Sequence, residues 1–77
     1  MKSEYCSVTY RWKGRGWTQE IRWLRIEGEK VQEWAGKSWT DFLNYMSTKG
    51  WELVAAAPLG GGEGAVYGIV AYFKRPG

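Results

Sequence analysis

The sequence contains no histidine, only one cysteine and only two prolines among 77 residues. Histidine is the usual general base near neutral pH and the commonest zinc ligand, so its absence excludes the most frequent acid–base and zinc chemistry. Cys6 has neither a histidine partner nor a second thiol, which argues against a nucleophile or an intrachain disulfide. We therefore predict a protein that is not an enzyme, with no catalytic residue, no cofactor and no metal site.

Long hydrophobic runs are also lacking. The longest one, Ala65–Phe73, is far shorter than the roughly 20 residues that cross a bilayer. The first ten residues contain no apolar segment of the kind found in signal peptides. A lone cysteine fits a reducing compartment, where it is usually a small buried hydrophobe. These observations predict a cytoplasmic protein with no membrane partner, folded as a single domain over residues 1–77.

Two glycine-containing stretches look like phosphate-binding loops. Gly36-Lys37-Ser38 precedes a predicted helix, but Val31 stands where a P-loop requires its first glycine. Gly60–Gly64 leads into a predicted strand, so no helix N-terminus follows it to hold a phosphate. We interpret the first stretch as a linker and the second as a hairpin loop.

Aromatic residues are abundant, with six Trp, five Tyr and two Phe, and they help to supply the core that so short a chain needs. The clearest pattern is a helix that follows Ser38, a good N-cap residue, with Asp41 in its first turn. Gly50 follows as a stop that tolerates the left-handed conformation. The apolar residues recur with helical spacing and predict one buried stripe, with Tyr45 on its flank: Trp39, Phe42, Leu43 and Met46.

The segments Gly50–Val54, Gly60–Gly64 and Phe73–Pro76 read G-W-E-L-V, a glycine-rich loop, and F-K-R-P. With these motifs, and more loosely with Glu4-Tyr5, the chain resembles a family of short bacterial proteins of unknown function. The resemblance covers about half of the chain, and the Trp-rich segment 17–34 departs from it. It implies a small antiparallel sheet with one helix and no established activity.

Residues 5–13 alternate in polarity, which predicts a strand with one apolar face: Cys6, Val8, Tyr10 and Trp12. A second β-rich run covers residues 17–26, and Gly14-Arg15-Gly16 between the two runs marks a hairpin. A loop with an even number of residues would place Trp17, Ile21 and Trp23 on the apolar face, and Arg11 near Glu20 on the other. We expect this register, and a short third strand over residues 31–34.

After the helix, residues 51–59 and 65–75 predict a second hairpin with apolar residues on both faces. Trp51, Leu53, Ala55 and Ala57 are expected under the helix, opposite Phe73, Ala71, Ile69 and Tyr67. A single helix covers one face only, so the other needs the Trp-rich hairpin, a ligand or another chain. We predict self-association, with a dimer as the expected state, through Val54, Ala56, Val66 and Val70.

The predicted fold is α+β, with four or five antiparallel strands and one helix on one face, in the order β-β-(β)-α-β-β. The leading functional interpretation is a non-enzymatic interaction module that self-associates through its sheet surface.

An alternative function follows from the charge, since residues 1–37 carry the whole net charge of +3. Segment 11–25 contains five of the basic residues: Arg11, Lys13, Arg15, Arg22 and Arg25. They predict possible contacts to an anion or to nucleic acid, with Trp12, Trp17 and Trp23 available for base stacking. The expected register weakens this alternative, because it places Arg11, Lys13 and Arg22 on the face opposite to the tryptophans.

Overall fold

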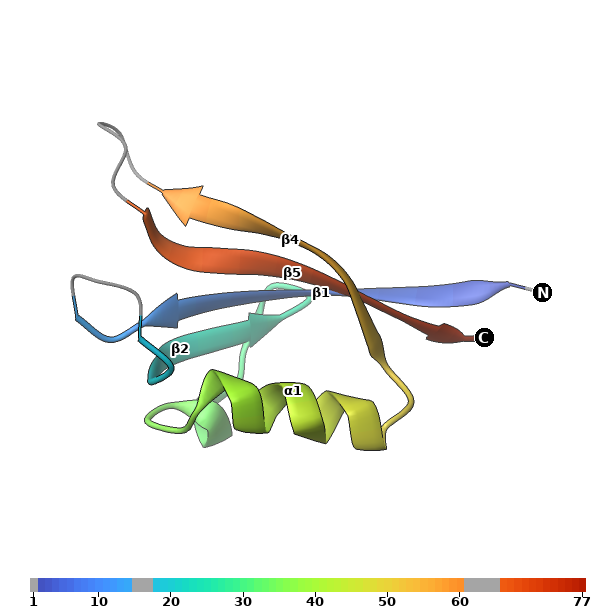
Figure 1. Ribbon diagram of the computed structural model, residues 1–77, viewed down its shortest axis with the longest axis horizontal. Helices are drawn as coiled ribbons and strands as arrows, with labels where there is room; N and C mark the ends of the chain where they lie inside the picture. Colours follow the sequence, from blue (N-terminus) through green and yellow to red (C-terminus); the bar gives the residue numbers. More distant parts are fainter. Residues whose placement is uncertain (1, 15–17, 61–65) are drawn as a thin grey trace.

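The computed structural model describes residues 2–14, 18–60 and 66–77. These residues form a five-stranded antiparallel sheet in the order β3-β2-β1-β5-β4, with helix α1 packed on one face (Figure 1). The predicted α+β class is confirmed. The elements are β1 (Ser3–Trp12), β2 (Ile21–Ile26), β3 (Glu29–Lys30), a 3-10 helix η1 (Gln32–Trp34), α1 (Trp39–Thr48), β4 (Glu52–Gly60) and β5 (Val66–Pro76). The element order therefore contains one element that was not predicted, the 3-10 helix η1 between β3 and α1.

Helix α1 begins and ends as its sequence predicts. The Ser38 hydroxyl accepts a hydrogen bond from the Thr40 N–H at 3.2 Å, and Asp41 lies in the first turn. At the other end Gly50 has φ = 85°, and its N–H donates to the Ser47 carbonyl. The Trp51 N–H donates to the Met46 carbonyl, which completes a Schellman motif. The predicted apolar stripe is confirmed: Trp39, Phe42 and Met46 are buried, and Leu43 packs against the core.

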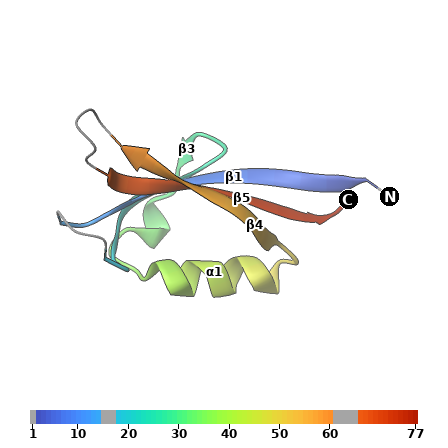
Figure 2. The ribbon, with the colours of Figure 1, turned by 45° about the horizontal axis from the view of Figure 1, so that its top comes forward.

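The core lies between α1 and the face of the sheet formed by β2, β1 and β5. Figure 2 shows the helix as a separate layer beneath that face. The alternation predicted for β1 is confirmed, because its four apolar side chains are all buried. Ile21 and Leu24 of β2 and Ala71 and Phe73 of β5 complete the buried set on the sheet side. We call this the helix side of the sheet and the opposite surface the helix-free face.

The third strand is not where the sequence predicted it. Residues 29–30 form β3, which pairs with β2 through Ile26 and Glu29. Glu27 and Gly28 between them both have positive φ, as a two-residue type I′ turn requires. The predicted strand at residues 31–34 is wrong, because Gln32–Trp34 turns as η1. Trp34 from this turn packs edge-on against Phe42, with ring centroids 5.1 Å apart.

The predicted register of the first hairpin is also wrong. Tyr10 pairs with Leu24 and Arg11 pairs with Trp23, so Trp23 lies on the helix-free face with Arg11. A bulge between Arg11 and Trp12 then brings Ile21 to the helix side, opposite Trp12. The strand begins at Ile21 rather than at residue 17, because the connection is longer than the glycines suggested. Trp17 lies outside the described residues.

A second bulge changes the faces of β4. Leu53 pairs with Phe73 on the helix side as expected, but Val54 is then an extra residue, and Ala55 pairs with Tyr72. Ala55 and Ala57 consequently lie on the helix-free face, and Ala56 lies on the helix side opposite Ala71. The prediction that Ala55 and Ala57 lie under the helix is wrong, because one inserted residue exchanges the faces of all those that follow.

Candidate functional site

Strand β4 is an edge strand that contributes nothing to the buried core. All of its residues are exposed except Leu59, which is half-buried. The core residues come from β1, β2, α1 and β5, because α1 packs over these strands and leaves β4 uncovered. The sequence E-L-V-A-A-A-P-L-G is nevertheless almost entirely apolar. An exposed apolar edge strand is unusual in a folded monomer, because such strands tend to associate with another chain.

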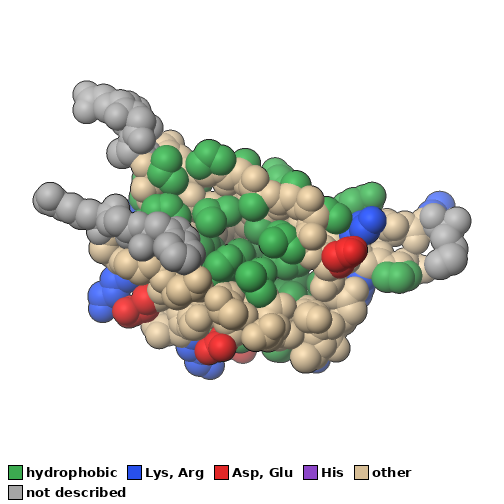
Figure 3. Space-filling view, in the orientation of Figure 1, with side chains coloured by type: hydrophobic (Ala, Val, Ile, Leu, Met, Phe, Trp, Pro, Cys, Tyr) green, Lys and Arg blue, Asp and Glu red, His purple; other side chains and the backbone are tan. Residues whose placement is uncertain are grey.

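The uncovered part of the helix side contains a hollow of about 320 Å³ between β4, β5 and the end of β1. No charged side chain lines it, and the floor includes the buried Trp12 and the half-buried Ile69. Figure 3 shows hydrophobic side chains gathered across the middle of this face, over β4 and β5. We call this surface the apolar hollow. Its lining residues on the helix side are Trp12, Ala56, Pro58, Val66 and Ile69, and Ala57, whose strand pairing points it to the other face, borders the hollow between Ala56 and Pro58.

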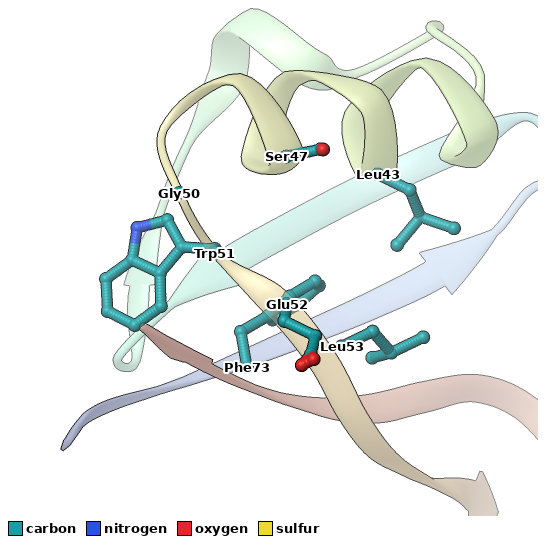
Figure 4. Close-up of a pocket in the computed structure, with 7 residues that line it drawn as sticks. All are labelled: Leu43, Ser47, Gly50, Trp51, Glu52, Leu53 and Phe73. Atoms are coloured by element: carbon teal, nitrogen blue, oxygen red, sulfur yellow. The ribbon is translucent and has the colours of Figure 1, made fainter. Parts of the chain in front are cut away.

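A second depression lies where the chain leaves α1 and enters β4. Figure 4 shows Leu43 extending from the helix towards the strands, while Trp51 turns to the other side. Leu53 and Phe73 also line this depression, and Glu52 is its only charged residue. The Arg75 guanidinium carbon lies 4.3 Å from the centroid of the Trp51 ring. The depression therefore extends the apolar surface towards the helix and offers little polar chemistry for a ligand.

The structure separates the four residues predicted for self-association. Ala56 and Val66 line the apolar hollow, and Val66 is 43% exposed. Val54 is the extra residue of the β4 bulge and is 45% exposed. Val70 pairs with Ala57 and Thr9, which places it on the helix-free face. The prediction of a single surface that includes Val70 is therefore wrong. The bulge at Val54 moves Ala56 to the helix side, and a further irregularity at Leu59/Gly60, opposite Gly68 and Val66, separates Val66 from Val70.

Two of the predicted basic residues lie together on the helix-free face. Arg11 is the strand partner of Trp23, and its guanidinium carbon lies 5.0 Å from the centroid of the Tyr67 ring on β5. The Arg25 guanidinium carbon lies 4.9 Å from the centroid of the Trp23 ring. Lys13 forms an ion pair of 3.6 Å with Glu20, the partner expected for Arg11. Arg22 is exposed at the start of β2. Arg15 lies outside the described residues.

Two ionisable groups in the core have raised pKa values. Burial raises the pKa of the Cys6 thiol, and the charge of Glu27 adds to this, while Arg75 acts in the opposite direction. Burial also raises the pKa of Tyr10, whose hydroxyl donates a hydrogen bond of 2.6 Å to the Thr18 carbonyl. Both groups are therefore held in their neutral forms, which for Cys6 is the less nucleophilic one.

Within residues 2–14, 18–60 and 66–77 no three His, Cys, Asp or Glu residues lie together as potential metal ligands. None of the helices in these ranges has the length and apolarity to cross a membrane.

Sequence reasoning missed several residues of both surfaces. Pro58 and Ile69 join the apolar hollow, and Lys30 joins the helix-free face. Pro58 carried a signal, since a proline inside a strand indicates a sheet edge. Ile69 and Lys30 depend on the irregular pairing of β4 with β5 and on β3, for which the sequence has no comparable signal. Comparisons of the chain with protein-family models, with curated proteins and with solved structures gave no match.

Proposed function

We propose that this protein is a non-enzymatic interaction module that self-associates through the apolar hollow and the adjoining edge of β4. The observation that carries the proposal is that β4 is apolar and exposed on both faces while α1 covers only the other strands. Leu53, Val54 and Val66 are each more than two-fifths exposed, and they lie along or beside this strand. Burying such side chains stabilises an assembly by about 25 cal/mol per Å² of apolar surface.

A second copy of the chain is the partner that the chemistry of the hollow favours. In a two-fold dimer the same patch of both copies forms the contact. A patch with charge of one sign would therefore face charge of the same sign. The hollow contains no charged lining residue, which removes this repulsion even though the chain carries a net charge of +3. Small residues such as Ala56 also allow the two copies to approach closely. We therefore propose a closed dimer.

The contact is proposed as packing of side chains rather than as addition of a strand. Pro58 has no N–H group, and a proline in a sheet is placed where no ladder partner is needed. It therefore interrupts the row of donors that an added strand would require. We also propose a cytoplasmic setting, in which the buried and unpaired Cys6 would stay reduced.

Measurement of molar mass in solution over a range of concentrations tests the proposal. We expect a dimer at micromolar concentration for the parent chain. Ala56→Lys, which places a charge in the apolar hollow, should shift the mass to that of a monomer. Ala55→Lys is the matched control, because Ala55 is equally an exposed alanine of β4 but pairs with Tyr72 on the helix-free face.

A monomeric parent chain at all concentrations would refute self-association. A dimer that survives Ala56→Lys but dissociates with Ala55→Lys would show that the helix-free face, rather than the hollow, is the contact. Circular dichroism of each variant shows whether the fold is retained, and both substituted positions are exposed, so we expect it to be.

A further inference from the structure

The helix-free face brings aromatic and basic side chains from four strands onto one surface. Directly paired residues of neighbouring strands point to the same side of a sheet. The pairs Arg11–Trp23, Thr9–Arg25 and Arg25–Lys30 therefore extend one surface across β1, β2 and β3. On the other side of β1, Ser7 pairs with Tyr72 and Tyr5 pairs with Lys74. No helix covers this face among the described residues (Figure 2).

Aromatic rings on this face remain accessible. Tyr5 is 67% exposed and Tyr72 is 45% exposed, although a tyrosine in a sheet commonly packs into a core. Trp23 is half-buried and carries the Arg25 guanidinium over its ring. Nucleic-acid bases stack on aromatic rings and on arginine guanidinium planes alike. The flat ring of Trp23 and the planar Arg25 guanidinium can therefore stack with a base, and the positive charge of Arg25 can attract the adjoining phosphate.

Positive charge dominates the same face. Strand pairing places Arg11, Arg25, Lys30, Lys74 and Glu52 on it, and Glu27 lies in the turn between β2 and β3. Lys13 and Glu20, which follow the pair Trp12–Ile21, neutralise each other in an ion pair. The Glu27 carboxylate is already held by Ser7, accepting from the backbone N–H at 3.1 Å and from the hydroxyl at 3.3 Å. Glu52 lies at the opposite end of the sheet, where it is the strand partner of Lys74. The region around Trp23 therefore presents cations without a competing free carboxylate among its neighbours on this face.

We propose that the helix-free face binds single-stranded nucleic acid, with bases stacked on Trp23 and Tyr72 and phosphates held by Arg11, Arg25 and Lys30. A single strand is favoured over a duplex, because stacked base pairs hide the base faces that the exposed rings would contact. The observed register is essential here. The register predicted from the sequence separated Trp23 from Arg11, whereas the actual pairing places Arg11 on the same face as Trp23 and Arg25.

The proposal is independent of self-association, because it uses the other face of the sheet. It is tested by fluorescence anisotropy of a labelled oligothymidylate of about 12 nucleotides, titrated with the protein over a salt series. We expect binding that persists at physiological ionic strength. The double variant Arg11→Gln with Arg25→Gln should bind about tenfold more weakly, and the slope of log affinity against log salt should fall by about 1.4, since each phosphate contact to a single strand contributes roughly 0.7.

The matched control removes two positive charges from the helix side. Lys37 and Lys49 also lie over aromatic rings, those of Trp34 and Tyr45, so Lys37→Gln with Lys49→Gln changes the net charge equally. We expect this variant to bind like the parent chain. Equal losses from the two double variants would overturn the proposal, since they would show attraction by net charge alone.

Two further measurements separate stacking from simple charge attraction. Trp23→Ala should weaken binding about tenfold, and Trp23→Phe should retain binding but lose most of the tryptophan quenching caused by the oligonucleotide. A duplex of the same length that binds as tightly as the single strand would overturn the proposal. Anionic lipid vesicles that bind while the oligonucleotide does not, or oligonucleotide binding that disappears at physiological salt, would also overturn it.

Discussion

The rings of Tyr10 and Trp39 stack face to face, with their centroids 4.4 Å apart and their planes 2° from parallel. Tyr10 comes from β1, the central strand of the sheet, and Trp39 from the first turn of α1. The stack therefore joins the middle of the sheet to the start of the helix. Aromatic contacts of this kind contribute about 0.5–1.5 kcal/mol beyond the burial of the two rings.

The hydroxyl of Tyr10 adds a second link, because it donates to the Thr18 carbonyl in the connection between β1 and β2. Tyr10→Phe keeps the stack and removes this bond, so we expect a loss of about 1 kcal/mol in the free energy of unfolding measured with urea. Tyr45→Phe is the control, since Tyr45 is 42% exposed and should tolerate the change. Equal unfolding free energies of Tyr10→Phe and the parent chain would show that this hydrogen bond does not stabilise the fold.

Gly50→Ala tests the end of the helix. A Cβ at this position would meet no atom within 4 Å, so the whole cost comes from the left-handed backbone conformation at φ = 85°. We expect a loss of about 1 kcal/mol in unfolding free energy. Gly50→Asn should recover part of it, because asparagine tolerates this conformation, and Asn44→Ala should be near neutral. Identical melting curves for Gly50→Ala and the parent chain would contradict the Schellman assignment.

Gly68→Ala tests a close approach between two strands. A Cβ on Gly68 would overlap the backbone oxygen of Tyr10 and crowd the Cα of Arg11, so β1 and β5 would have to separate. We expect a loss of about 1–3 kcal/mol, as for overpacked core positions. Gly28→Ala is the control without a steric overlap. Its Cβ would meet no atom within 4 Å, so its cost comes only from the positive φ of the backbone. If Gly68→Ala costs less than Gly28→Ala, the strands do not lie as close as described.

Alkaline pH should destabilise the fold through Cys6 and Tyr10. Both groups are neutral when protonated, and burial raises the pKa of each in the folded chain above its value in the unfolded chain. The resulting stabilisation is complete below the usual pKa values of 9.0 for the thiol and 10.0 for the phenol, and it is lost as the pH rises through the folded values. We expect the unfolding free energy to fall above these values.

The variants Cys6→Ala and Tyr10→Phe serve as controls for this pH dependence. Each removes one titrating group, so each should reduce the slope of stability against pH in the alkaline range. A slope that neither variant changes would assign the effect to other groups.

Local signals in the sequence were sufficient for the helix and for the first strand. Ser38 and Gly50 mark the two ends of α1 because capping depends on the immediate backbone alone. The alternation from Cys6 to Trp12 identifies the buried face of β1 because side chains on a strand alternate with period two. From these elements the α+β class and the burial of the apolar stripe of the helix could be predicted.

The faces of the outer strands were decided only by the tertiary structure. The bulges at Arg11/Trp12 and at Leu53/Ala55 each insert one residue, and a shift by one residue moves every following side chain to the other face. Trp23 and Arg25 thus join Arg11 on the helix-free face, and Ala56 joins the apolar hollow. Composition and periodicity determined which residues are apolar, aromatic or basic, but pairing across strands determined which of them share a surface, because register depends on contacts between distant parts of the chain.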